Sequence, residues 1–122
     1  MKVFNVNFQG KKNSIYCECE NTRNGFKHVA TMYYNKNTYV AVCYYINRTW
    51  KAFIYQAVIR KLYCIILDEL KVKAVDEWKA AKGKKRISTT ERERIYQDID
   101  ALFKDSFKEI EQQPSYSYAC ND

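Results

Sequence analysis

Residues 50–82 contain neither proline nor glycine, and this uninterrupted run constrains the fold more than any other feature of the sequence. Its apolar residues recur every three or four positions, which is the spacing of one face of an α-helix. Thr49 precedes the run and carries the hydroxyl of a typical helix N-cap. The pattern therefore predicts a helix of roughly 30 residues, about 50 Å long. The residues that define its apolar face are Trp50, Phe53, Ile54, Ala57, Val58, Leu62, Ile65, Ile66 and Leu70.

The length of this helix raises a packing problem. A domain of this size has a diameter of about 30 Å, so the helix would extend beyond the sheet that it covers. Two solutions are open: the helix breaks near residues 71–74, or a second subunit covers the exposed end. We favour the second subunit.

The first 48 residues show a different period. Val3 to Phe8 alternates, and Ile15, Cys17 and Cys19 alternate with polar or larger side chains in the next segment. Residues 26–34 and 39–46 complete the set, with a hairpin signal at residues 24–25 and a turn at residues 35–37. This pattern predicts a four-stranded antiparallel meander.

A second helix follows a basic loop at residues 83–86. Residues 88–91 read Ser-Thr-Thr-Glu, which is a capping box. The apolar stripe is Ile95, Ile99, Leu102, Phe103, Phe107 and Ile110, and Pro114 ends the helix. We expect one α+β domain over residues 1–122: a four-stranded antiparallel N-terminal meander (1–48), two C-terminal helices, the first one long (49–113), and a tail (114–122).

Charge is unevenly distributed along the chain. The net charge is +7, but residues 1–87 carry 17 basic and 6 acidic side chains, a balance of +11, and residues 88–122 carry 4 basic and 8 acidic, a balance of −4. The basic part favours an anionic partner, such as a phosphate compound, nucleic acid or an acidic protein surface. Plain solvation is the alternative.

The junction between the last strand and the first helix is the leading candidate site. Asn47, Arg48, Thr49 and Trp50 stand together there, and Phe53 follows. A guanidinium binds phosphate, an indole stacks on a base, and a helix N-terminus supplies backbone donors. The alternative is a capped helix start with Trp50 in the core.

Two further groups belong to the same predicted ligand site. Arg23, Asn24 and Phe26 lie at the hairpin tip, where they either close over a ligand or form a solvated turn whose Phe26 packs on a neighbouring side chain. Arg92 and Arg94 lie in the segment Glu-Arg-Glu-Arg at the start of the last helix. This segment either forms a solvated face with local ion pairs, or its arginines contact an anion across an interface.

The loop between the helices is a candidate second anion site. Gly83, Lys84, Lys85 and Arg86 follow Lys82, so that a glycine and four cations share a short segment. The spacing of a Walker sequence is absent. The alternative is an ordinary basic connector.

The residues favour a binding protein over an enzyme. His28 is the one histidine, and no nucleophile lies near it in sequence, so we assign no catalytic residue. Cys17 and Cys19 are too close for the common zinc spacing, and we predict no metal and no cofactor. The five cysteines suggest reduced, buried thiols in the cytoplasm. We see no signal peptide, and the longest apolar run, residues 62–67, is too short to span a bilayer.

The small sheet followed by two helices, with Asn-Gly-Phe at residues 24–26 and Asn-Arg-Thr-Trp at residues 47–50, resembles small proteins of phages and mobile elements. Within that group the chain is similar to the phage anti-Thoeris sponge family. Those proteins sequester cyclic ADP-ribose isomers made by bacterial TIR-domain enzymes and do not cleave them.

The resemblance implies an anti-defence protein acting in the host cytoplasm, assembled as a homodimer or as a higher oligomer such as a hexamer, with pockets at subunit boundaries. It also allows a second site for cyclic oligonucleotides, which residues 82–86 would provide. We expect no membrane partner. The competing hypotheses are an anti-CRISPR-type inhibitor of a host protein, a nucleic-acid-binding phage protein, and an enzyme that hydrolyses a messenger.

Overall fold

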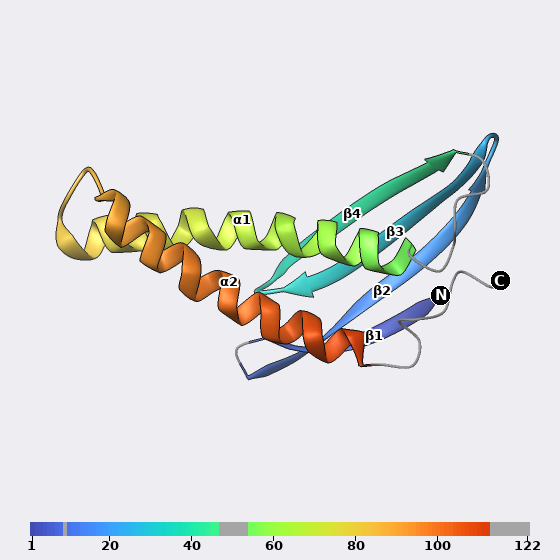
Figure 1. Ribbon diagram of the computed structural model, residues 1–122, viewed down its shortest axis with the longest axis horizontal. Helices are drawn as coiled ribbons and strands as arrows, with labels where there is room; N and C mark the ends of the chain where they lie inside the picture. The colour runs from blue at the N-terminus through green and yellow to red at the C-terminus, as the bar shows by residue number, and fades with distance from the viewer. Residues whose placement is uncertain (9, 47–53, 113–122) are drawn as a thin grey trace.

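The computed structural model describes residues 1–8, 10–46 and 54–112, and it consists of one sheet and a helical hairpin (Figure 1). The four strands run in the order β1-β2-β3-β4, each antiparallel to its neighbour. The predicted α+β class, with a meander followed by two helices of which the first is long, is confirmed. The elements are β1 (Lys2–Phe8), β2 (Lys11–Thr22), β3 (Gly25–Tyr34), β4 (Asn37–Ile46), α1 (Ile54–Lys82) and α2 (Thr89–Glu111).

The alternation in the strands sorts side chains onto two faces, as predicted. Phe4, Val6 and Phe8 of β1 are at most 3% exposed, and Ile15 and Cys17 of β2 lie on the same buried face. Between β3 and β4 a two-residue turn is formed by Asn35 and Lys36, whose φ values of 49° and 64° are those of a type I′ hairpin turn. The register is thus set by local turn chemistry and by burial of one face.

Both helices cover the buried face, and one core joins the sheet to them. Phe8 joins side chains of β3 and both helices, with its ring centroid 5.0 to 5.6 Å from those of Tyr34, Tyr63 and Phe103. Such tilted and edge-to-face pairs are the favoured aromatic geometries. Ser106 of α2 also donates its hydroxyl to the Asn7 carbonyl of β1 at 2.8 Å, which fixes α2 against the first strand.

The first helix is continuous, so the first of the two solutions, a break near residues 71–74, does not occur. Its 29 residues extend well past the sheet (Figure 1). The first half of α2 packs beside this overhang, where Lys71 of α1 forms an ion pair with Asp100 at 2.8 Å and lies 5.1 Å from the Tyr96 ring centroid. The second helix therefore covers part of the surface for which a second subunit was expected, and the second subunit stays a prediction.

Several apolar side chains of the helices are more exposed than their periodicity predicted. Ile65 and Leu102 are about two-fifths exposed, Ala57 is exposed, and Cys64 is also exposed rather than buried. These residues stand at the margin of the predicted stripes, one helical step away from Val58, Leu62 and Ile66 on α1 and from Phe103 on α2. Each helix therefore buries a narrower apolar face against the sheet and the other helix than the spacing of its apolar residues predicted.

Candidate anion-binding site

A hollow of about 450 Å³ lies at the turn between the two helices, at the end of the hairpin farthest from the sheet. Side chains from the last turn of α1, the connecting turn and the first turns of α2 meet there. The lining residues are Trp78, Lys82, Lys84, Arg86, Ser88, Glu91 and Arg94.

The turn between the helices is fixed by a C-terminal motif at the end of α1 and by an N-cap at the start of α2. Gly83 has a φ of +61°, a left-handed conformation that costs a residue with a Cβ about 1–2 kcal/mol. It allows the Lys84 N–H to donate to the Lys79 carbonyl at 3.0 Å and the Gly83 N–H to the Ala80 carbonyl at 3.3 Å, the bonds of a Schellman motif. The chain thereby reverses within a few residues and brings Lys84 back toward Trp78.

The start of α2 is fixed by the predicted cap. Ser88 has extended backbone angles, and its hydroxyl oxygen accepts a hydrogen bond from the Glu91 N–H at 3.2 Å. Because Ser88 and Glu91 both line the hollow, the positively polarised N-terminus of α2 lies beside it. The Ser88 hydroxyl also keeps its own O–H as a donor toward a ligand.

Cations dominate the hollow. Lys82, Lys84, Arg86 and Arg94 line it together with one carboxylate, Glu91, among the described residues. Arg94 Nη2 lies 2.7 Å from Glu91 Oε2, which orients the guanidinium along the first turn of α2. Like charges gathered on one small surface repel one another, and a bound anion relieves that repulsion.

The indole of Trp78 supplies an aromatic surface beside these cations. Lys84 Nζ lies 6.0 Å from the indole ring centroid, at the outer limit of a cation–π contact. Trp78 is only partly buried, so ring surface remains accessible. An aromatic plate next to Lys and Arg side chains is the combination that binds a base together with its phosphates.

The structure unites some of the predicted site residues and not others. Lys84 and Arg86 of the basic loop meet Arg94 of the last helix in one hollow, whereas Gly83, Lys85 and Arg92 do not line it. The two groups were assigned to separate sites from the sequence. Trp78 was not predicted as a site residue, although its position four residues before Lys82 places both side chains on one helix face.

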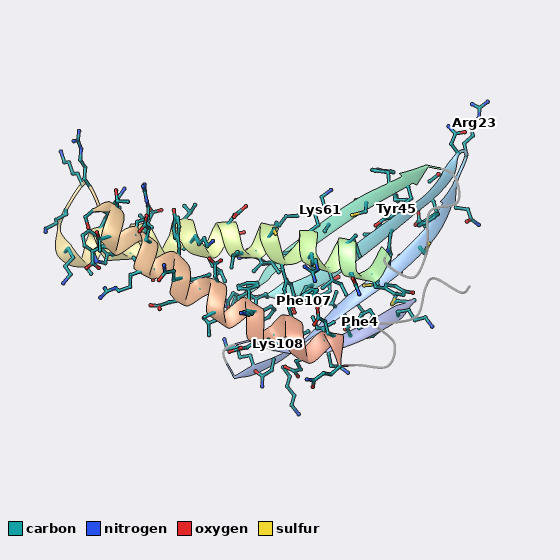
Figure 2. The ribbon with its side chains drawn as sticks, viewed as in Figure 1. Phe4, Arg23, Tyr45, Lys61, Phe107 and Lys108 are labelled. Atoms are coloured by element: carbon teal, nitrogen blue, oxygen red, sulfur yellow. The ribbon has the colours of Figure 1, made fainter. Side chains whose placement is uncertain are left out.

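The hairpin-tip residues lie at the opposite end of the molecule. Arg23 and Asn24 are exposed at the β2–β3 turn, far from the α1–α2 turn (Figure 2). Phe26 is 5% exposed and stacks on Tyr45, with centroids 4.8 Å apart and an interplanar angle of 20°. The ring therefore belongs to the core and does not form the ligand wall that the sequence suggested. Within one chain, this tip and the cationic hollow are separate.

The other predicted ligand-binding residues cannot be placed in either region. Asn47, Arg48, Thr49, Trp50 and Phe53 lie outside the described residues.

His28 is a core residue. Its side chain is fully buried, with its ring centroid 4.7 Å from that of Tyr55 in an edge-to-face arrangement. Among the described residues, no three His, Cys, Asp or Glu side chains gather in a way that could hold a metal ion. In the same part of the chain, neither helix is long and apolar enough to span a bilayer.

Comparison of the chain with protein-family models, with curated proteins and with solved structures finds no match.

Proposed function

We propose that this protein binds a nucleotide-type signalling molecule and sequesters it without cleaving it. The observation that carries the proposal is the hollow in which the Trp78 indole stands beside Lys82, Lys84, Arg86 and Arg94. Phosphates pair with the guanidinium and ammonium groups, and a base stacks on the indole. The Ser88 hydroxyl is a partner for a ribose hydroxyl.

The finer proposal is that the ligand is a cyclic ADP-ribose isomer made by a TIR-domain enzyme, and that the protein is a phage anti-defence sponge in the host cytoplasm. Such a ligand carries a pyrophosphate, an adenine and two riboses, which match the donor types in the hollow. The resemblance at residues 24–26 and 47–50 supports the same ligand class. Cyclic oligonucleotides share the phosphate and base chemistry and belong to the same proposal.

We also propose that the protein forms a homodimer or a higher oligomer, because the two predicted anion-binding regions lie apart within one chain. Arg23 and Asn24 lie at one end, and the cationic hollow lies at the other. A homodimer or higher oligomer can bring the hairpin tip of one copy to the helical turn of another. The proposed assembly thus gives both regions access to one ligand.

A release assay tests sequestration. The purified protein is mixed with lysate containing the TIR-made messenger, the protein is removed by filtration, and the retained fraction is heated and analysed by mass spectrometry. Sequestration predicts that the messenger leaves the filtrate and returns intact after heating. Recovery only as linear ADP-ribose would make the protein an enzyme, and messenger left in the filtrate would contradict the proposal.

Two double variants with the same change in charge locate the binding. Arg86→Ala/Arg94→Ala removes two cations from the lining of the hollow, whereas Lys85→Ala/Arg92→Ala removes two exposed neighbours that do not line it. We expect the first variant to leave the messenger in the filtrate and the second to remove it as the wild type does. Equal loss in both would point to general charge attraction.

Nucleic acid is the second candidate, and the same cation cluster favours it. Its affinity would fall steeply with salt and would depend on all nearby cations, including Lys85 and Arg92. A host-protein inhibitor is the remaining alternative. Capture of a protein from host lysate by both double variants, without messenger binding, would favour it.

A further inference from the structure

Two adjoining hollows, of about 530 and 290 Å³, lie on the face of the sheet that the helices leave open, and the larger one extends past the edge strand β1 to Glu109 of α2. Tyr16 of β2 and Tyr33 of β3 line both of them, so the hollows are parts of one surface. The two rings meet edge to face with centroids 6.3 Å apart, and Tyr33 is 60% exposed. A pair of exposed rings in contact offers a preformed aromatic platform.

Neutral hydrogen-bonding groups surround the platform. The larger hollow is lined by Asn5 and Asn7 of β1 and by Asn13 and Ser14 of β2. Asn5 pairs directly with Ser14 across the strands, and Ser14 Oγ donates to Asn5 Oδ1 at 3.1 Å, so these groups are held in place by each other and by the sheet. Thr31 adds a hydroxyl in the smaller hollow.

The charge of this surface differs from that of the helical turn. Lys12 and Glu109 line the larger hollow and balance each other, and Glu18 lines the smaller one. The charged side chains that the described residues contribute to the lining are one cation and two carboxylates, so these hollows lack the cation cluster that attracts a phosphate-bearing ligand to the helical turn. An apolar group seated in the larger hollow would remove its amides from water without replacing their hydrogen bonds.

We propose that the open sheet face is a binding site for a neutral polyhydroxylated ligand, namely a saccharide chain. A sugar ring places an apolar C–H face on a tyrosine and directs its hydroxyls to the amide and hydroxyl groups at the ring edge. Because Tyr16 and Tyr33 line both hollows, a chain of several sugar units spans them. This site does not depend on the proposed messenger site.

The test uses neutral oligosaccharides with different linkages as probes: cellohexaose, chitohexaose, maltohexaose and a linear mannan. Each is titrated into the isotopically labelled full-length protein, and NMR chemical shifts are recorded. We expect at least one probe to shift residues of β1, β2 and β3 around Tyr16 and Tyr33 in a saturable manner. Tyr33→Ala should weaken that binding by about two- to tenfold, the loss of one stacked ring.

Tyr44→Ala is the matched control. Tyr44 is on the same face and 72% exposed, but it lines neither hollow. It should bind the saccharide as the wild type does, and the unchanged spectra of distant residues report that both variants fold.

Two results overturn the assignment: no saturable shift with any of the four probes, or equal weakening by Tyr33→Ala and Tyr44→Ala. An oligothymidylate serves as a further probe. Saturable shifts of the same residues with this probe alone would replace the saccharide by single-stranded nucleic acid.

Discussion

Lys84 Nζ lies 6.0 Å from the centre of the Trp78 indole, and Gly83 makes the turn that brings the two together. Trp78 belongs to the long helix and Lys84 follows its end, so the pair depends on how the helix terminates. The cationic hollow is thus a consequence of the Schellman turn and of the Ser88 cap that starts α2 immediately afterwards.

Loss of the indole should weaken messenger binding. Base–aromatic stacking contributes about 1–3 kcal/mol, so we expect Trp78→Ala to raise the dissociation constant by about tenfold or more, with Trp78→Phe in between. Isothermal titration with the cyclic ADP-ribose isomer measures this. An unchanged constant for Trp78→Ala would remove the indole from the ligand contacts.

Messenger binding should be sensitive to salt because the cations of the hollow are exposed to solvent. Raising the salt from about 50 to about 500 mM shortens the screening length to a few ångströms and should weaken binding several-fold. Arg86→Ala/Arg94→Ala should flatten this dependence, and Lys85→Ala/Arg92→Ala should flatten it less. Fluorescence anisotropy of a labelled messenger gives both slopes, and identical slopes would contradict the local origin of the attraction.

Truncation of Phe8 should destabilise the core strongly. Its side chain is 3% exposed and lies against three aromatic rings, so Phe8→Ala should lower the free energy of unfolding by about 3–5 kcal/mol. Tyr33→Ala removes a similar ring from the open face and should change it by about 0.5 kcal/mol or less. Urea unfolding compares them, and equal losses would contradict the assignment of buried and open faces.

Tyr39 links stability to alkaline pH. Burial, together with a hydrogen bond to the Glu69 carboxylate, raises the pKa of the Tyr39 phenol above its ordinary value of 10.0. The unfolded chain therefore loses this proton first, and the free energy of unfolding falls as pH rises through about 10 toward the folded-state pKa. Tyr39→Phe should show a shallower fall in urea unfolding between about pH 9 and pH 11. A slope equal to that of the wild type would exclude this linkage.

The sequence contained enough to predict the sheet and both helices. Alternation identified the inward faces of β1 and β2, and the capping box located the start of α2, because these signals act within a few residues. The packing of the overhang was not predictable in the same way. It depends on the pairing of Lys71 with Asp100, which are far apart in the sequence and meet only after the helical hairpin forms.

The candidate site was also only partly predictable from the sequence. Residues 83–86 were recognisable as an anion loop, but the sequence did not indicate that Arg94 would share a hollow with Lys84 and Arg86. It also did not indicate that Trp78 would form the aromatic wall of that hollow. Both follow from the sharpness of the turn. Phe26 illustrates the converse: a hairpin-tip aromatic resembles a ligand contact until its stacking on Tyr45 is known.

The most direct test of the account follows the indole N–H resonance of Trp78 while the cyclic ADP-ribose isomer is titrated into the isotopically labelled protein. Assignment comes from the signal lost in Trp78→Phe, and Trp50 provides the second indole in the same spectrum. The account predicts that the Trp78 resonance shifts and saturates as the messenger binds. Saturable messenger binding that leaves the Trp78 resonance unmoved would contradict it.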